Sequence, residues 1–214
     1  NVKSLEAVIG PSIGGLMALE FCTMYPDFVN KLISISSGYK LSTLQTLHNL
    51  EQAYILDLGR ESNNRNNEYL SLARMVAHKT YISLELLSNR AKSETLYDDN
   101  LIKGFLSTPQ ESYMMHQGEK FIERFTPESY LSIIKGWQNF KIEQEDLNKL
   151  KNIETLIISV DSDVCFYPDE QKEFLGVLNN HEIKTTYKTI NSTKGHDSFL
   201  LEPELFEDNL ENFL

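Results

Sequence analysis

Cysteines and clustered basic side chains are scarce in this sequence, and each scarcity excludes a class of protein. The 214 residues include two cysteines, Cys22 and Cys165, which stand far apart and outside any CxxC pair. A disulfide framework is therefore excluded, and we expect both thiols to be reduced. The formal net charge is −11, and no stretch is rich in Lys and Arg. Because phosphate backbones are bound by clustered cations, nucleic acid is not an expected partner.

Long apolar runs and metal-binding patterns are missing as well. No stretch reaches the ~20 apolar residues that a membrane-spanning helix requires, and no signal peptide opens the sequence. We therefore expect a soluble, cytoplasmic protein with no membrane partner. The five histidines are scattered, and Asp161-x-Asp163 lacks the glycine and the glutamate of a calcium loop. These absences predict no structural metal and no permanently bound cofactor.

The most informative stretch that is present reads as a strand, a tight turn and a helix. Val8 and Ile9 are β-branched residues in a short apolar run, and residues 16–24 are compatible with a helix. Between them, Gly10-x-Ser12-x-Gly14 matches the nucleophile elbow, a sharp turn that raises a serine hydroxyl above the sheet. Both flanking glycines are expected because side chains would collide where the strand and the helix approach each other. A plain Gly/Ser turn is the alternative interpretation.

This elbow stands unusually close to the start of the sequence. About ten residues precede Ser12, whereas the elbow of an α/β-hydrolase fold follows several strands. We therefore expect the N-terminal strands of the sheet to be missing from this chain. The backbone amide of Ile13, directly after the serine, is the expected oxyanion donor.

The rest of the sequence changes from strand-like to helical character and back, which predicts an α/β fold with a helical insertion. We expect α/β-hydrolase core at residues 1–39, a helical cap at 40–148, and core again at 149–214. A cap over the carboxyl ends of the strands is favoured over simple packing, because ligands bind at those ends. Beyond the elbow, the expected strands are 28–37, 154–160 and 184–190, and the expected helical runs are 41–58, 68–89, 113–125, 127–140, 168–178 and 203–213.

Three chemically matched residues stand at the carboxyl ends of expected strands: Ser12, Asp163 and His196. Their chain order, Ser then Asp then His, is the order of the α/β-hydrolase triad. A serine hydroxyl needs a general base, which His196 supplies, and Asp163 orients the imidazole. Asp161 competes with Asp163 for the acid role, or caps a turn after its strand. His196 taken alone has an alternative interpretation, because a lone loop histidine is more often a surface residue than a base.

Several segments of the sequence resemble the homoserine O-acetyltransferases of methionine biosynthesis, which are α/β-hydrolase acyltransferases. The resemblance covers nearly the whole chain. Its specific parts are an Ala-Arg-Met segment and a Gly-His-Asp-x-Phe-Leu segment, which generic hydrolases lack. Pro11 and Ile13 depart from the Gly and Met that this family commonly carries around its serine. The segments that carry the resemblance are 10–15, 18–20, 25–27, 73–81, 118–121, 124–125, 129–131, 162–163 with 166 and 168, and 195–202.

The resemblance implies a ping-pong acyltransferase in which Ser12 accepts an acyl group from acyl-CoA and passes it to an amino-acid hydroxyl. It implies Arg74, Tyr81 and Asp197 as binders of the amino acid. Arg74 and Tyr81 are seven residues apart, so they share one face of a helix. A guanidinium can hold a carboxylate, and a carboxylate can hold an ammonium group. The alternative for Arg74 is a structural ion pair with Glu68 or Glu85.

The implied substrates are L-homoserine with acetyl-CoA or succinyl-CoA, and the implied assembly is a homodimer through the helical cap. Serine is an alternative acceptor, because one methylene separates the two amino acids by only ~1–3 kcal/mol in a pocket. The alternative functions are a serine esterase or thioesterase with the same triad, and a non-catalytic interaction protein. The family's N-terminal part supplies a second oxyanion donor, so this chain alone is not expected to hold the complete site.

Overall fold

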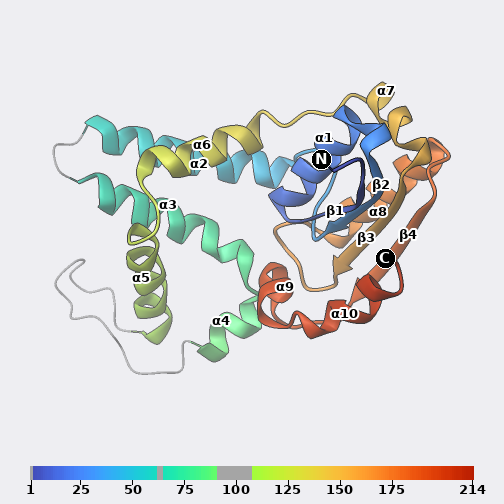
Figure 1. Ribbon diagram of the computed structural model, residues 1–214. Helices are drawn as coiled ribbons and strands as arrows, with labels where there is room; N and C mark the ends of the chain where they lie inside the picture. The colour runs from blue at the N-terminus through green and yellow to red at the C-terminus, as the bar shows by residue number, and fades with distance from the viewer. Residues whose placement is uncertain (1, 62–64, 91–107) are drawn as a thin grey trace. The chain divides into compact units, whose positions relative to one another are not determined.

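A computed structural model describes residues 2–61, 65–90 and 108–214 (Figure 1). The chain forms two compact units, one of Asn1–Ser42 with Phe140–Leu214 and the other of Thr43–Asn139. We call them the sheet unit and the helical unit. The boundaries expected from the sequence lay after residues 39 and 148. The second boundary falls earlier because Leu147 and Leu150 are fully buried in the core of the sheet unit.

The sheet unit holds a four-stranded parallel sheet in the order β1-β2-β3-β4. Neighbouring strands are joined in register, with Gly10 opposite Ser34, Ile35 opposite Ile158, and Val160 opposite Ile190. The carboxyl ends of all four strands therefore meet at one edge. The strands are β1 (Leu5–Pro11), β2 (Val29–Ile35), β3 (Glu154–Val160) and β4 (Thr185–Ile190).

Alternate residues of the central strands enter two different apolar layers, as a sheet buried on both faces requires. On one face, Leu32 and Ile157 pack with Leu19 and Phe174 from helices. On the other, strand residues including Ile33 pack with Phe206. The helices of this unit are α1 (Ile13–Met24), α7 (Gln144–Leu147), α8 (Pro168–Asn180), α9 (Ser198–Leu201) and α10 (Glu204–Glu211), with short 3-10 turns η1 (Pro26–Phe28), η2 (Asn148–Asn152) and η3 (Gly195–Asp197).

The helical unit contains α2 (Thr43–Glu61), α3 (Asn66–Tyr81), α4 (Leu84–Arg90), α5 (Pro109–Ile122) and α6 (Pro127–Gln138). Its apolar core brings together α2, α3, α5 and α6 through buried residues that include Leu56, Leu70 and Phe121. Both α5 and α6 begin with a threonine capping box followed by proline, from Thr108 and Thr126. Such boxes satisfy amides that the first helical turn leaves free, so they fix where each helix begins.

One expected helical run, residues 68–89, is divided in the structure. Ile82 adopts an extended conformation and ends α3, and the Ser83 hydroxyl accepts a hydrogen bond from the Leu86 amide at 3.1 Å. A new helix therefore begins within the run. In the described part of the chain, every helix is too short or too polar to cross a bilayer.

Candidate active site

Ser12 occupies a strained turn between β1 and α1. Its φ of 56° and ψ of −133° place a residue with a side chain in the left-handed region, and such strain persists only where surrounding contacts enforce it. Two backbone hydrogen bonds of 2.9 Å do so here: the Ser12 amide donates to the Ile35 carbonyl, and the Gly15 amide donates to the Ser12 carbonyl. The turn has the strained geometry typical of a nucleophile elbow.

The glycines of this turn make room for the approach of strand and helix. A Cβ atom on Gly10 would lie 2.0 Å from the Gly14 carbonyl oxygen, and one on Gly15 would lie 2.5 Å from the Ser37 Cβ. On Gly14, by contrast, a Cβ atom would meet the Pro11 Cδ at an ordinary 3.5 Å. The expectation that a side chain would collide at both flanking glycines is therefore right for Gly10 and wrong for Gly14. The second close approach is at Gly15.

A chain of hydrogen bonds joins Ser12, His196 and Asp163, which come from three different strand ends of the sheet unit. The Ser12 Oγ lies 2.7 Å from the His196 Nε2, and the His196 Nδ1 lies 2.8 Å from the Asp163 Oδ2. Because a carboxylate only accepts, it fixes the tautomer with the proton on Nδ1 and leaves Nε2 to accept from serine. The arrangement can remove a proton from the serine hydroxyl.

The acid and the base of this chain are buried and held from several sides. The Asp163 side chain is 0% exposed and that of His196 is 3% exposed. The second carboxylate oxygen of Asp163 accepts from the amides of Cys165 at 2.8 Å and Phe166 at 2.9 Å, so the buried charge is satisfied. The imidazole stacks on Phe166 and meets the edge of Phe199, each with 5.5 Å between ring centroids.

Asp161, the competing acid, serves a different purpose in the structure. Its carboxylate accepts from the Ser192 amide at 3.0 Å, and its own amide donates to the Ile190 carbonyl. Asp161 thus ties the end of β3 to the loop that leads to His196. Between the two acids that the sequence left open, Asp163 contacts the imidazole.

A polar network around the histidine loop was not expected from the sequence. The Ser192 hydroxyl donates to Glu202 at 2.5 Å and accepts from the Lys194 amide at 3.0 Å. The Ser162 hydroxyl bonds the Ser192 carbonyl and accepts from the Gly195 amide at 3.0 Å. These bonds fix the loop that holds His196. The sequence shows only that serines occur in and near this loop, and serines are common in loops of any kind.

A half-buried acid near the triad, Glu170, was not expected from the sequence. Glu170 lies in the first turn of α8, the helix that follows Asp163 in the chain. Burial raises the pKa of Glu170, and the negative charges of Asp163 and Glu173 raise it further, while a hydrogen bond from Ser42 lowers it.

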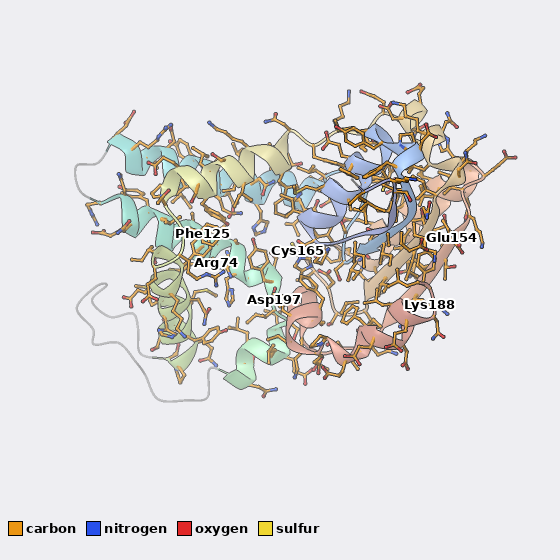
Figure 2. All side chains as sticks on the ribbon, viewed as in Figure 1. Arg74, Phe125, Glu154, Cys165, Lys188 and Asp197 are labelled. Carbon is orange, nitrogen blue, oxygen red and sulfur yellow. The ribbon has the colours of Figure 1, made fainter. Side chains whose placement is uncertain are left out.

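The remaining expected site residues lie in both units. Ile13 is the first residue of α1, where backbone N–H groups have no partner within the helix. Asp197 follows His196 in η3 and is half-buried. Arg74 and Tyr81 share one face of α3, and the Arg74 Cζ lies over the Tyr81 ring at 4.8 Å. Figure 2 labels Arg74 among the helices of its unit and Asp197 next to α9.

The structural alternative for Arg74 finds no support among the described residues. Glu68 pairs with Arg65 instead, and no carboxylate of the described ranges forms an ion pair with Arg74. In the same ranges, no three side chains of His, Cys, Asp or Glu are grouped so that they could hold a metal ion.

Comparisons with known proteins give homologues along nearly the whole chain. No family model matches. The chain is 36% identical to a homoserine O-acetyltransferase of Methanosalsum zhilinae over an alignment of 216 positions, which covers 94% of this chain and 44% of the relative. It is 33% identical to one of Methanobrevibacter ruminantium, covering 100% of this chain and 46% of the relative. The chain therefore spans about half the length of these curated relatives.

Solved structures with the same fold include an acyltransferase and an esterase. Homoserine O-acetyltransferase from Bacillus anthracis matches with a TM-score of 0.85 and 18% identity, covering 99% of this chain and 60% of that one. Esterase E22 matches with a TM-score of 0.85 and 17% identity, covering 99% of this chain and 61% of that one. The predicted α/β-hydrolase fold class is confirmed, and this chain forms part of that fold.

Proposed function

We propose that this chain, a homologue of the homoserine O-acetyltransferases, bears the nucleophile, base and acid of an enzyme that transfers an acetyl group from acetyl-CoA to the hydroxyl of L-homoserine. The observation that carries the proposal is the hydrogen-bonded chain from Asp163 through His196 to a strained Ser12. The homologues named for this activity support the choice of reaction.

In the first half-reaction, the Ser12 Oγ attacks the thioester carbonyl while the His196 Nε2 takes the hydroxyl proton. Asp163 stabilises the imidazolium that forms. The Ile13 amide donates to the oxyanion of the tetrahedral intermediate, aided by the positive end of α1. The carbon–sulfur bond then breaks, His196 returns the proton to the departing thiolate, and free CoA leaves an acetyl ester on Ser12.

In the second half-reaction, the homoserine hydroxyl replaces the serine hydroxyl as the nucleophile. His196 takes the proton of the acceptor, whose oxygen attacks the acetyl ester of Ser12. Collapse of the second tetrahedral intermediate forms O-acetylhomoserine, and His196 returns the proton to Ser12. The same base thus serves both half-reactions, and the proposed cycle requires no permanently bound cofactor.

We assign the charged ends of the acceptor to Arg74, Tyr81 and Asp197. The Arg74 guanidinium has no ion-pair partner among the described residues, so it is available for the substrate carboxylate. The half-buried Asp197, directly after the catalytic base, is suited to hold the ammonium group. Binding both charged groups of the amino acid would orient its hydroxyl for attack, and such positioning accelerates the reaction.

The second candidate is a hydrolase that uses the same three residues with water as the acceptor. The structural match to esterase E22 favours it, with the same TM-score of 0.85 as the Bacillus anthracis acyltransferase. The fold and the triad suit both reactions, so only the acceptor-binding residues distinguish them.

The test is release of free CoA from acetyl-CoA in the presence and absence of L-homoserine. We expect release to depend on homoserine, to vanish in Ser12→Ala, and to fall strongly in Arg74→Ala while hydrolysis of a simple acetyl ester continues. Arg124→Ala is the matched control, because Arg124 also lies over an aromatic ring of the helical unit, that of Phe125. CoA release at the same rate without homoserine supports the hydrolase instead.

The finer parts of the assignment extend this proposal. We propose a place in methionine biosynthesis, a cytoplasmic location where acetyl-CoA is available, and a homodimer formed by the helical cap. Sedimentation of the protein gives the oligomeric state, and parallel assays with succinyl-CoA and L-serine determine the donor and the acceptor.

A further inference from the structure

The guanidinium of Arg74 lies between two aromatic rings of the helical unit. Its Cζ is 4.8 Å from the centroid of the Tyr81 ring and 4.9 Å from the centroid of the Phe121 ring. Tyr81 comes from the end of α3, and Phe121 comes from α5. A guanidinium is planar and stacks on ring faces, so two rings restrict its rotation more than one does.

The Phe121 ring is itself held in place by neighbouring rings. It stacks on Phe125 with 4.5 Å between centroids and meets Tyr130 edge to face at 4.8 Å. The Tyr130 hydroxyl in turn bonds the side chain of Gln52 on α2. Phe121 is 7% exposed, so it is a fixed part of the core rather than a mobile surface ring.

The Tyr81 ring is supported from its other neighbours on α3 and α5. The His78 ring meets the Tyr81 ring edge to face, with 6.4 Å between ring centroids. The His78 Nε2 lies 3.3 Å from the Tyr113 hydroxyl. The two helices can pack closely because Gly118 faces Ser71, where a Cβ atom would lie 2.2 Å from the serine hydroxyl. Both rings beside Arg74 are therefore anchored in the α3–α5 packing.

We propose that Tyr81 and Phe121 form an aromatic clamp that fixes the Arg74 guanidinium in the orientation that receives an amino-acid carboxylate. Phe121 is thus a positioning residue: it holds Arg74, and Arg74 binds the acceptor. The face of the Tyr81 ring holds Arg74 in the same way. The inference rests on the proposed function for the identity of the ligand. The clamp itself does not depend on turnover, because it is a property of the side chains in the free protein.

The first arm of the test measures the mobility of the guanidinium without substrate. Labelling with 15N-arginine gives five Nε–H signals for the five arginines, and the Arg74→Lys variant identifies that of Arg74. We expect an Arg74 order parameter near the rigid value of about 0.85, falling below about 0.6 in Phe121→Leu and in Tyr81→Leu. Tyr81→Phe keeps the ring face and should keep the order parameter.

The second arm measures binding and turnover of L-homoserine. We expect Phe121→Leu to raise the KM for homoserine about tenfold, the size of one lost ring contact, with the rate of Ser12 acetylation unchanged. Leu131→Ala is the control for general loosening, because Leu131 is buried in the same apolar cluster as Phe121 and has no aromatic ring to stack on a guanidinium. It should leave both the order parameter and the KM close to those of the unmodified protein.

Three results overturn the clamp. The first is a mobile Arg74 in the unmodified protein. The second is an equal loss of order in Leu131→Ala. The third is a raised KM in Phe121→Leu with Arg74 still rigid, which makes Phe121 a substrate contact. If no variant transfers acetyl groups, the proposed function fails, and titration of the Arg74 Nε–H signal with L-homoserine still tests the clamp.

Discussion

At the scale of single residues, the two aspartates after β3 offer a matched pair for testing the triad. Asp163 contacts the imidazole from a fully buried position, whereas Asp161 contacts a loop amide. We expect Asp163→Asn to lower kcat by about 10³ to 10⁴, because an amide favours the wrong imidazole tautomer. Asp161→Asn should cost less than about tenfold, since only the tie to Ser192 is weakened. Steady-state kinetics of both variants gives the comparison.

Equal losses in the two aspartate variants would contradict this account. They would mean that the order of the histidine loop, and not the chemistry of the acid, limits the rate. A thermal unfolding curve for each variant separates this outcome from simple destabilisation.

Burial makes Cys22 a reporter of folding. Its side chain is fully buried, and desolvation raises the pKa of the thiol from 9.0 to about 12. The unfolded chain therefore loses this proton first, so the contribution of Cys22 to the free energy of unfolding should be constant below pH 9 and fall as pH rises from 9 towards 12. The slope from this group is at most about 1.4 kcal/mol per pH unit. Denaturant titrations at several pH values, compared with those of Cys22→Ala, measure it.

The same burial predicts that folded Cys22 resists alkylation at pH 9. Rapid reaction of the folded protein, or identical pH slopes for the unmodified protein and Cys22→Ala, would contradict the assigned environment.

Residue types and chain order were enough to nominate Ser12, Asp163 and His196 from the sequence. Their catalytic roles stay a prediction, although the structure joins them by hydrogen bonds. The supporting contacts could not be nominated, because Glu202 and Phe121 act through the partners that folding brings to them. The sequence does not show which side chains will surround a given glutamate or phenylalanine after folding.

At the scale of elements, the glycines of the elbow separate steric need from helix propensity. A methyl group on Gly10 would overlap the Gly14 carbonyl, whereas on Gly176 of α8 it meets nothing within 4 Å. We expect Gly10→Ala to disrupt the turn and remove activity. Gly176→Ala should stabilise the protein by about 0.5–1 kcal/mol, because alanine loses less entropy in a helix. Thermal unfolding and CoA-release assays of both variants test the contrast.

If Gly10→Ala folds with full activity, the elbow described here is wrong. A destabilised Gly176→Ala would instead show that α8 has a close neighbour at that position.

Strands were easier to predict than helix ends. The segment 154–160 was expected as a strand and is β3, since its β-branched run suits a sheet buried on both faces. The helical run 68–89 gave no sign of the break at Ile82, because the residues on both sides keep helical spacing. The cap at Ser83 decides the break, and serine is common at many positions that are not caps.

At the scale of the whole molecule, the fold class followed from the order of strand, helix and motif. Parallel strands joined by helices place Ser12, Asp163 and His196 at one edge of the sheet. The role of the helical unit as a cap stays a prediction. Its residues could not be assigned contacts from the sequence, since helical periodicity shows a buried face without showing what buries it.

The net charge of −11 also has a consequence for the whole molecule. Acetyl-CoA is an anion, so the summed field of the protein opposes its approach. We expect the KM for acetyl-CoA to fall as ionic strength rises from about 0.01 M to 0.15 M, because the Debye length shortens from roughly 30 to 8 Å. A KM that rises with salt would reveal a local cationic site that outweighs the net charge. The neutral substrate p-nitrophenyl acetate is the control, and its KM should not change.

The central claim is that Ser12 carries the acetyl group between donor and acceptor. The direct measurement mixes the protein with acetyl-CoA, quenches it in acid, and locates the acetyl group by peptide mass spectrometry. We predict one acetyl group on Ser12, absent in His196→Ala, and lost to O-acetylhomoserine when L-homoserine is added before the quench. An unlabelled Ser12, or an acetyl group that water removes as fast as homoserine does, would contradict the account.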